Sequence, residues 1–377
     1  MLASGDDMNT RESLVIDSLA RFHTRGDGAA WPTVTVIVPT YNRAGPLADT
    51  LTHLSAQDYP ADRLRVIVAS DGSTDATEAI VRGFDPARVG LLAFAAPRGK
   101  AACLNDAIAA CDEEVLVLTD ARQRLDPDAV RHLVSDLADP QVGAVGGELV
   151  FEGVDAGGFA GGVGAYWRYE TFIRRSQAAV HSSPGVSGAL YALRRSCFRP
   201  IPANTILDDV AIPMQAVLQG KRVAFDGRAR AYDTPSTDAR QERRRKVRTL
   251  AGNFQLLTLY PQLLLPWRNP IAFPFVSHKV LRLAAPWAMA GALAANVLLA
   301  PRAPGYAALL AAQAAFYALA LAGTLIPASG RWIAFRLPAT FVALNGFALL
   351  GLVEFATNRN AHLWRAGTGV AAGRPRA

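Results

Sequence analysis

The sequence predicts an α/β domain with a mostly parallel sheet, followed by a transmembrane region in the C-terminal part of the chain. Short apolar runs rich in β-branched residues alternate with helical segments of roughly ten to fifteen residues, which is typical of repeated βαβ units. Polar loops follow the ends of these runs. Three long runs near the C-terminus carry almost no charge, which predicts membrane helices. With 377 residues, the chain is long enough for one large domain and a further region.

The first two strands of the predicted sheet each lead into a polar loop. Residues 34–38 form an apolar run that ends at Pro39, and a helix is expected over residues 46–57. Residues 64–70 form the second run, which leads into the tight turn 71–75. Ser, Thr and Asp side chains in this turn can cap the helix that we expect after it.

Residues 115–118 form a continuous apolar run, typical of a strand buried on both faces of a sheet, and Asp120 follows its end. A carboxylate there is costly unless a cation meets it, and a metal-bound phosphate is one candidate. The alternative is that Asp120 caps the next turn, with Arg122 as its salt-bridge partner. A strand over 89–95 and a helix over 101–110 precede this run. Because ligands bind beyond the carboxyl ends of parallel strands, we expect the polar loops to form one site.

The second half of the α/β domain holds two further polar motifs. The glycines of the turn at 184–191, Gly188 among them, would let the backbone approach a ligand closely, although a plain turn explains them equally well. Asp208 and Asp209 precede a helix, where acids ordinarily act as capping residues. The other expected elements are a strand pair over 142–151, a glycine-rich loop over 153–164 and helices over 166–178 and 210–218.

Charge and cysteine content limit the classes of partner and compartment. The net charge of +7 is concentrated late in the chain, because Glu354 is the only acid from residue 251 onward. Basic residues beside apolar spans suit an anionic membrane surface or a phosphate-rich ligand. Nucleic acid is not expected, because no basic patch with interleaved aromatic residues occurs. The cysteines form no C-x-x-C pair, which favours a reducing compartment, and the acidic N-terminus does not resemble a signal peptide.

The composition divides the chain into an N-terminal extension, the α/β domain, an amphipathic interfacial segment, a transmembrane region of three helices and a basic tail. Their expected bounds are 1–31, 32–250, 251–282, 283–357 and 358–377. His278, Lys279 and Arg282 place the start of the first span in the cytoplasm. Three crossings would then put the basic tail outside. Either one span is re-entrant, or the segment 263–275 also enters the membrane.

Six ordered motifs resemble those of family 2 glycosyltransferases, which are inverting, nucleotide-sugar-dependent enzymes with a GT-A fold. The motifs are VIVPTYNR (36–43), ASDGSTD (69–75), RGKAACLNDA (98–107), LTDAR (118–122), GVSGALYALRR (185–195) and LDD (207–209). The resemblance covers residues 33–255. The basic stretch before the membrane region resembles that of membrane-integrated members, such as cellulose, chitin and hyaluronan synthases.

On the nucleotide side, the resemblance implies roles for residues of three motifs. Pro39, Thr40 and Tyr41 would line the nucleobase pocket, and Asp71 would bind the uracil or the ribose. Lys100 would contact the nucleotide.

The resemblance also implies how the diphosphate is held. Asp120 matches the first acid of the family's D-x-D pair, which binds the diphosphate through a divalent cation, Mg²⁺ or Mn²⁺, while Arg122 stands in place of the second acid. The family's Q-x-x-R-W motif falls on 245–249, where only its arginine, Arg248, is kept. We expect Arg248 to bind the departing diphosphate, because the guanidinium fork suits phosphate.

Asp209, the second acid of LDD, matches the general base that deprotonates the acceptor hydroxyl. Asp209 suits this role if Asp208 raises its pKa, because a nearby like charge raises the pKa of a carboxyl group. Gly188, Asp208 and Arg245 are expected on the acceptor side.

The expected enzyme is a hexosyl- or N-acetylhexosaminyltransferase in the inner membrane, with its catalytic domain in the cytoplasm. It would move a sugar from a UDP-sugar to a polysaccharide or lipid-linked glycan, next to membrane lipids and export partner proteins. One alternative is a transferase onto a polyprenyl phosphate. Another is a non-catalytic nucleotide-sugar-binding subunit of a glycan export complex.

Overall fold

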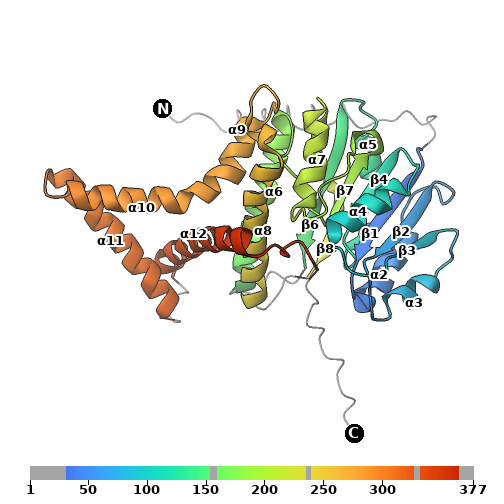
Figure 1. Cartoon of the computed structure of the whole chain (residues 1–377), viewed down its shortest axis with the longest axis horizontal. Coiled ribbons are helices and arrows are strands. Elements are labelled where there is room, and N and C mark those ends of the chain that lie inside the picture. The colour runs from blue at the N-terminus through green and yellow to red at the C-terminus, as the bar shows by residue number, and fades with distance from the viewer. Residues whose placement is uncertain (1–30, 153–158, 235–238, 327–331, 365–377) are drawn as a thin grey trace, which may run out of the picture.

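The computed structural model describes residues 31–152, 159–234, 239–326 and 332–364. Within these ranges, an eight-stranded sheet with helices on both faces forms the α/β domain, and three long helices extend away from it (Figure 1). The predicted fold class, an α/β domain with a mostly parallel sheet followed by C-terminal apolar helices, is confirmed. Apart from Trp31 and residues 358–364, the predicted N-terminal extension and basic tail lie outside the described residues.

The first half of the sheet is parallel. Strand β1 (Val34–Thr40) pairs with β2 (Leu64–Ser70) and with β4 (Val115–Thr119), and β2 pairs with β3 (Val89–Ala93). Every residue of β1 and β4 is buried, as expected for strands with helices on both faces. The predicted strands are confirmed, and their carboxyl ends share one rim.

The second half of the sheet is mixed, and the strand order is β3-β2-β1-β4-β7-β6-β8-β5. Strand β7 (Leu190–Arg194) runs antiparallel between β4 and β6 (Val142–Phe151). Strand β8 (Arg222–Asp233) pairs with β6 in parallel and with the short β5 (Arg124–Leu125) in antiparallel orientation. The prediction of a strand pair over 142–151 is wrong. A single strand runs through the glycines of this stretch, with an irregular register. Neighbouring segments of the same chain approach these glycines too closely to leave space for side chains.

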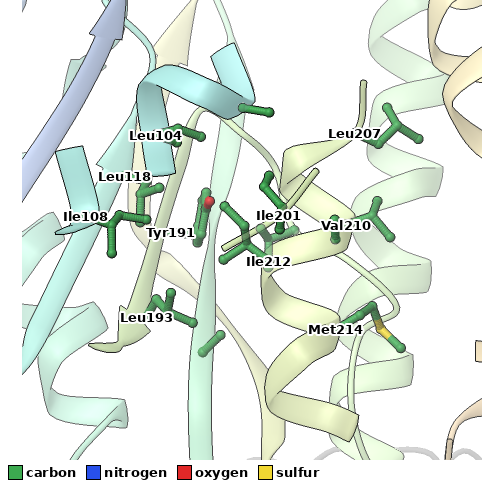
Figure 2. Packing of buried hydrophobic residues seen from close by; sticks show 14 of the residues in the cluster. Leu104, Ile108, Leu118, Tyr191, Leu193, Ile201, Leu207, Val210, Ile212 and Met214 are labelled. Carbon is green, nitrogen blue, oxygen red and sulfur yellow. The ribbon is translucent and has the colours of Figure 1, made fainter. Parts of the chain in front are cut away.

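Helices cover both faces of the sheet. On one face lie α2 (Ala44–Ser55), α3 (Thr77–Arg82) and α5 (Ala129–Asp136), and on the other lie α4 (Lys100–Ala109) and α7 (Asp208–Leu218). Figure 2 shows Leu104 of α4, Tyr191 of β7 and Ile212 of α7 close together in the second of these layers. The layered core holds the strand ends in fixed relative positions.

Two longer helices flank the domain, α6 (Phe159–Val180) and α8 (Ala239–Leu259). The predicted helix over 166–178 is confirmed, whereas the glycine-rich loop predicted over 153–164 is helical from residue 159. Helix propagation adds one hydrogen bond for each residue fixed, so α6 extends into this stretch despite its glycines. After α8, the chain forms three short helical segments, η2 (Pro261–Leu264), α9 (Ala272–Phe275) and η3 (Val276–Val280). A further short helical turn, η1 (Arg195–Cys197), follows β7.

The last three helices are α10 (Leu281–Leu299), α11 (Pro304–Leu325) and α12 (Ile333–Thr357). Together with the turns before α10, they are long and apolar enough to cross a membrane. The second half of α12 returns to the domain and packs on α8 (Figure 1). There the rings of Phe254 and Phe355 stack with centroids 6.3 Å apart. The start of α10 also contacts the domain, through an ion pair of 2.9 Å between Arg282 and Glu170. Both ends of this helical region therefore lie at the same domain.

The close packing of α12 on α8 depends on Gly351. A Cβ atom at Gly351 would lie 2.7 Å from Cβ of Leu250 and 3.1 Å from the backbone nitrogen of Ala251, whereas one at Gly346 of the same helix would meet nothing within 4 Å. We expect Gly351→Ala to lower the stability by about 1–3 kcal/mol through overpacking. Gly346→Ala is the matched control and should leave stability equal or higher, by up to about 1 kcal/mol, because alanine favours a helix. Thermal unfolding in detergent would measure both, and equal midpoints for the two variants would contradict the close contact.

Candidate functional site

The loops after β1 and β2 are joined by hydrogen bonds at the rim of the sheet. The side-chain oxygen of Asn42 accepts the backbone N–H of Thr74 at 2.7 Å, and the backbone N–H of Asn42 donates to Oγ of Ser73 at 3.1 Å. The backbone N–H of Asp71 donates to the carbonyl of Thr40 at 2.9 Å. Two predicted nucleotide-binding residues, Thr40 and Asp71, are therefore held side by side.

Asp71 is fully buried, and its carboxylate is compensated by directed donors. It accepts the backbone N–H groups of Arg98, at 3.1 and 3.0 Å, and of Gly99, at 2.7 Å. It also accepts the indole N–H of Trp364 at 2.7 Å. Such charge-assisted hydrogen bonds make a buried carboxylate tolerable.

Trp364 is a residue that the sequence analysis missed. Its ring stacks on Tyr41, with centroids 6.5 Å apart and an angle of 30° between the planes. Just before it, the carbonyl of Ala361 accepts Nε of Arg248 at 3.1 Å. The segment after α12 therefore lies over residues predicted to bind the nucleotide. A lone tryptophan in a basic tail was the only signal that could have pointed to it.

Lys100 links two of the predicted acids. Its ammonium lies 3.0 Å from Oδ1 of Asp120 and 3.1 Å from Oδ2 of Asp208. Burial alone would lower the pKa of Lys100, but Asp120 and Asp208 outweigh burial and raise it. Lys100 therefore stays charged.

Asp120 is half-buried at the end of β4. Burial alone would raise its pKa, but the charges of Lys100 and Arg122 hold the pKa below the usual carboxyl value. The side chain of Arg122 forms an ion pair with Asp233 at 3.0 Å. Among the described residues, Arg122 therefore does not form the local salt bridge with Asp120 that was the alternative explanation of this carboxylate. Arg245, predicted on the acceptor side, carries its charge close to Arg122 and Asp233.

Asp208 and Asp209 are the first two residues of α7, whose cap position is Leu207. They therefore lie in the first turn, where a negative charge suits the helix dipole, and not at the cap itself. Burial and the neighbouring Asp208 raise the pKa of Asp209, against the effect of Lys100. A Cβ atom at Gly188 would lie 3.8 Å from Oδ2 of Asp209 and 3.5 Å from Nζ of Lys100, so the backbone of the Gly188 turn faces both groups.

One small pocket collects residues of several motifs. Its lining consists of Pro39, Lys100, Leu104, Leu118, Thr119, Gly188, Tyr191 and Asp208. Within the described part of the chain, the buried hydroxyl of Tyr191 has no hydrogen-bond partner. The sequence analysis quoted Tyr191 within a motif but gave it no role. A larger hollow of about 640 Å³ lies between α11 and α12, but its lining is apolar and offers no group for a charged ligand.

A metal ion would find few protein ligands here. The described residues hold no group of three or more His, Cys, Asp and Glu side chains that could surround an ion. Asp120 offers one half-buried carboxylate at the rim. This donor set fits a divalent cation that arrives with phosphate oxygens as its other ligands, which is common for Mg²⁺.

The family model described as glycosyl transferase family 2 matches residues 35–201. An N-acetylglucosaminyltransferase of Bradyrhizobium elkanii is 36% identical over 128 residues, which is 33% of this chain and 69% of that protein. An N-acetylglucosaminyltransferase of Azorhizobium caulinodans is 29% identical over 178 residues, which is 46% of this chain and 45% of that protein. The β-monoglucosyldiacylglycerol synthase of Synechocystis is 29% identical over 119 residues, which is 30% of this chain and 25% of that protein. The chain thus spans less than half the length of the last two relatives.

A solved structure resembles nearly the whole chain. It is the mannosyltransferase PcManGT from Pyrobaculum calidifontis, in complex with GDP-Man and Mn²⁺, with 26% sequence identity and a TM-score of 0.64. The match covers 93% of this chain and 95% of that one. It confirms the GT-A fold that the motifs imply. Together with the sequence relatives, it identifies the chain as a glycosyltransferase that belongs to glycosyl transferase family 2.

Proposed function

We propose that this glycosyltransferase transfers a sugar from a UDP-sugar to a glycan or lipid-linked acceptor at the membrane surface. The observation that carries the proposal is that Lys100 and its acidic partners gather residues of three separate motifs at one rim of the sheet. In this proposal Tyr41 faces the base, the buried Pro39 and Thr40 support it from behind, and Asp71 accepts a ring N–H of uracil. The relatives named as an N-acetylglucosaminyltransferase and as a β-monoglucosyldiacylglycerol synthase support the class of reaction.

The diphosphate of the donor lies, in this proposal, between Asp120 and the basic residues of α8. A divalent cation, Mg²⁺ or Mn²⁺, supplies positive charge to the departing diphosphate when it is bound by Asp120. Arg248 provides a second positive charge through a fork that fits phosphate oxygens. Lys100 keeps Asp120 ionised and therefore able to bind the cation.

Asp209 acts as the general base. Its raised pKa brings it closer to the working pH than an ordinary carboxylate, which improves proton transfer. The acceptor hydroxyl would approach beside Gly188, because the backbone of this residue lies next to both Asp209 and Lys100. Loss of its proton to Asp209 lets the hydroxyl oxygen attack the anomeric carbon opposite the leaving diphosphate.

The enzyme sits in the inner membrane, with its catalytic domain on the cytoplasmic side. The basic residues at 278–282 and the return of α12 to α8 support this placement. Three complete crossings would leave the two ends of the helical region on opposite sides, yet both ends contact the same domain. We therefore assign a partial crossing to α12, because its second half packs against α8. The boundaries at 250, 282 and 357 stay predictions.

Transfer to a polyprenyl phosphate is a second candidate. The positive charges of Lys279, in the turn before α10, and of Arg174 in α6 act to lower the pKa of Asp209, so both lie near this carboxylate. A lipid phosphate at the membrane surface would be attracted to these charges. Product analysis separates the candidates, because the first yields an extended glycan and the second a single lipid-bound sugar.

Replacing the acids of the site should strongly reduce transfer. We expect Asp209→Asn to lower the turnover number by about 10²–10⁴-fold, which is the usual contribution of a general base, while UDP binding persists. Asp120→Ala should reduce both donor binding and turnover. The exposed Asp49 offers a matched control, and Asp49→Asn should behave as wild type.

Release of UDP from a panel of UDP-sugars, with Mg²⁺ or Mn²⁺ present, would measure these effects. Near wild-type turnover in Asp209→Asn would refute the general-base role. Binding of UDP without any sugar release by the wild-type enzyme would instead indicate a non-catalytic subunit.

The pH dependence should report the pair Asp208 and Asp209. Activity requires ionised Asp209, so kcat/KM falls as the pH drops through the raised pKa of this group. Asp208→Asn removes one cause of the raised pKa, and the acidic fall should therefore move to lower pH. A pH profile of the variant beside Asp49→Asn would measure the shift. An acidic fall that stays in place or moves upward would contradict the coupling.

A further inference from the structure

Residues 358–364, which follow α12, form a short strap over the rim of the sheet. A turn in which the N–H of Leu363 donates to the carbonyl of Asn360, at 3.1 Å, shapes the strap. Ala361 is buried, with 4% of its surface exposed, so the strap is packed into the domain and does not lie loosely on it. The segment comes from the far end of the chain, yet it contacts the loops after β1, β2 and β3.

The indole of Trp364 makes the contacts that a nucleobase would need. It is a flat ring that stacks on Tyr41, and its N–H donates to Oδ2 of Asp71 at 2.7 Å. Uracil, like the indole of Trp364, is a flat ring with a ring N–H group that can donate a hydrogen bond. Besides the N–H of Trp364, Oδ2 of Asp71 accepts the N–H of Gly99 at 2.7 Å and shares the N–H of Arg98 with Oδ1, so three donors crowd this one oxygen. A base therefore cannot reach this oxygen while Trp364 occupies it.

The strap also contacts residues near the proposed phosphate end of the donor site. A Cβ atom at Gly99, whose φ is +97°, would lie 3.0 Å from Cδ2 of His362, so the strap rests directly on the loop before Lys100. The carbonyl of Ala361 accepts Nε of Arg248, the residue assigned to the diphosphate. The strap thus holds groups at both the base end and the phosphate end of the donor site.

We propose that the strap is autoinhibitory, with Trp364 standing in for the nucleobase, so that the donor must displace the strap to bind. The proposal rests on the donor pocket assigned above. Its consequence follows from population arithmetic, because the apparent dissociation constant equals the intrinsic one divided by the fraction of molecules with an open strap. Any change that weakens the hold of Trp364 therefore tightens nucleotide binding.

Calorimetric titration of the full-length protein in detergent with UDP, and in parallel with GDP, tests the strap. Trp364→Ala removes both the stacking and a hydrogen bond to a charged group, so the dissociation constant for UDP should fall about tenfold. Trp364→Phe keeps a ring against Tyr41 but donates no hydrogen bond, and its value should fall between those of Trp364→Ala and wild type. Trp267→Ala is the matched control, because Trp267 is 77% exposed elsewhere, and it should bind as wild type does.

The outcomes separate the strap from the proposed function. Equal UDP affinity of wild type and both Trp364 variants would overturn the inhibitory strap and leave the donor site intact. Weaker binding by both variants would also overturn it, and would make the strap a lid that closes over bound nucleotide. If neither UDP nor GDP binds to any variant or to the wild type, the donor site itself is wrong, and the strap proposal falls with it.

Discussion

The ammonium of Lys100 is the interaction on which the rest of the site depends. It compensates two carboxylates on different elements, Asp120 after β4 and Asp208 at the start of α7. Acids gathered in one place repel each other, and a charge left without a partner in a protected site is strongly destabilising. Lys100 is the first residue of α4, directly after the left-handed turn at Gly99, so a backbone turn sets where this compensating charge lies.

The residues that could be predicted from the sequence are those at the ends of strands and the starts of helices. The locations of Asp71, Lys100 and Asp120 follow from the alternation of strands and helices, because parallel strands bring their carboxyl ends to one rim. Their expected roles came from the family resemblance. Strand β8 was not predicted, although Arg228 and Arg230 alternate with buried alanines as in a half-buried strand, because alanine has a low strand propensity and makes this pattern weak. The contact between Trp364 and Asp71 joins residues 293 positions apart, and no local pattern encodes such a contact.

Arg122 changes the electrostatics of the rim. Where the family motif has a second acid, this chain has an arginine that pairs with the buried Asp233 at 3.0 Å. Arg245 lies nearby, and burial together with the charge of Arg122 lowers its pKa. The surroundings of Asp120 therefore contain more fixed positive charge than a pair of acids would leave. In the proposed donor site, these surroundings would favour a diphosphate anion and reduce the positive charge that a metal ion has to supply.

In the proposed membrane placement, the contact at Gly351 links helix α8 to the bilayer. Helix α8 carries Arg245 and Arg248 in its first half and packs on α12 through Leu250 and Phe254. A helix is stiff along its axis, and a long apolar helix tilts when the bilayer becomes thinner. A change of lipid thickness would then tilt α12, and α8 would carry this motion to the arginines that we propose to bind the donor. Lipid composition becomes a variable of catalysis in this arrangement, although no lipid needs to enter the site.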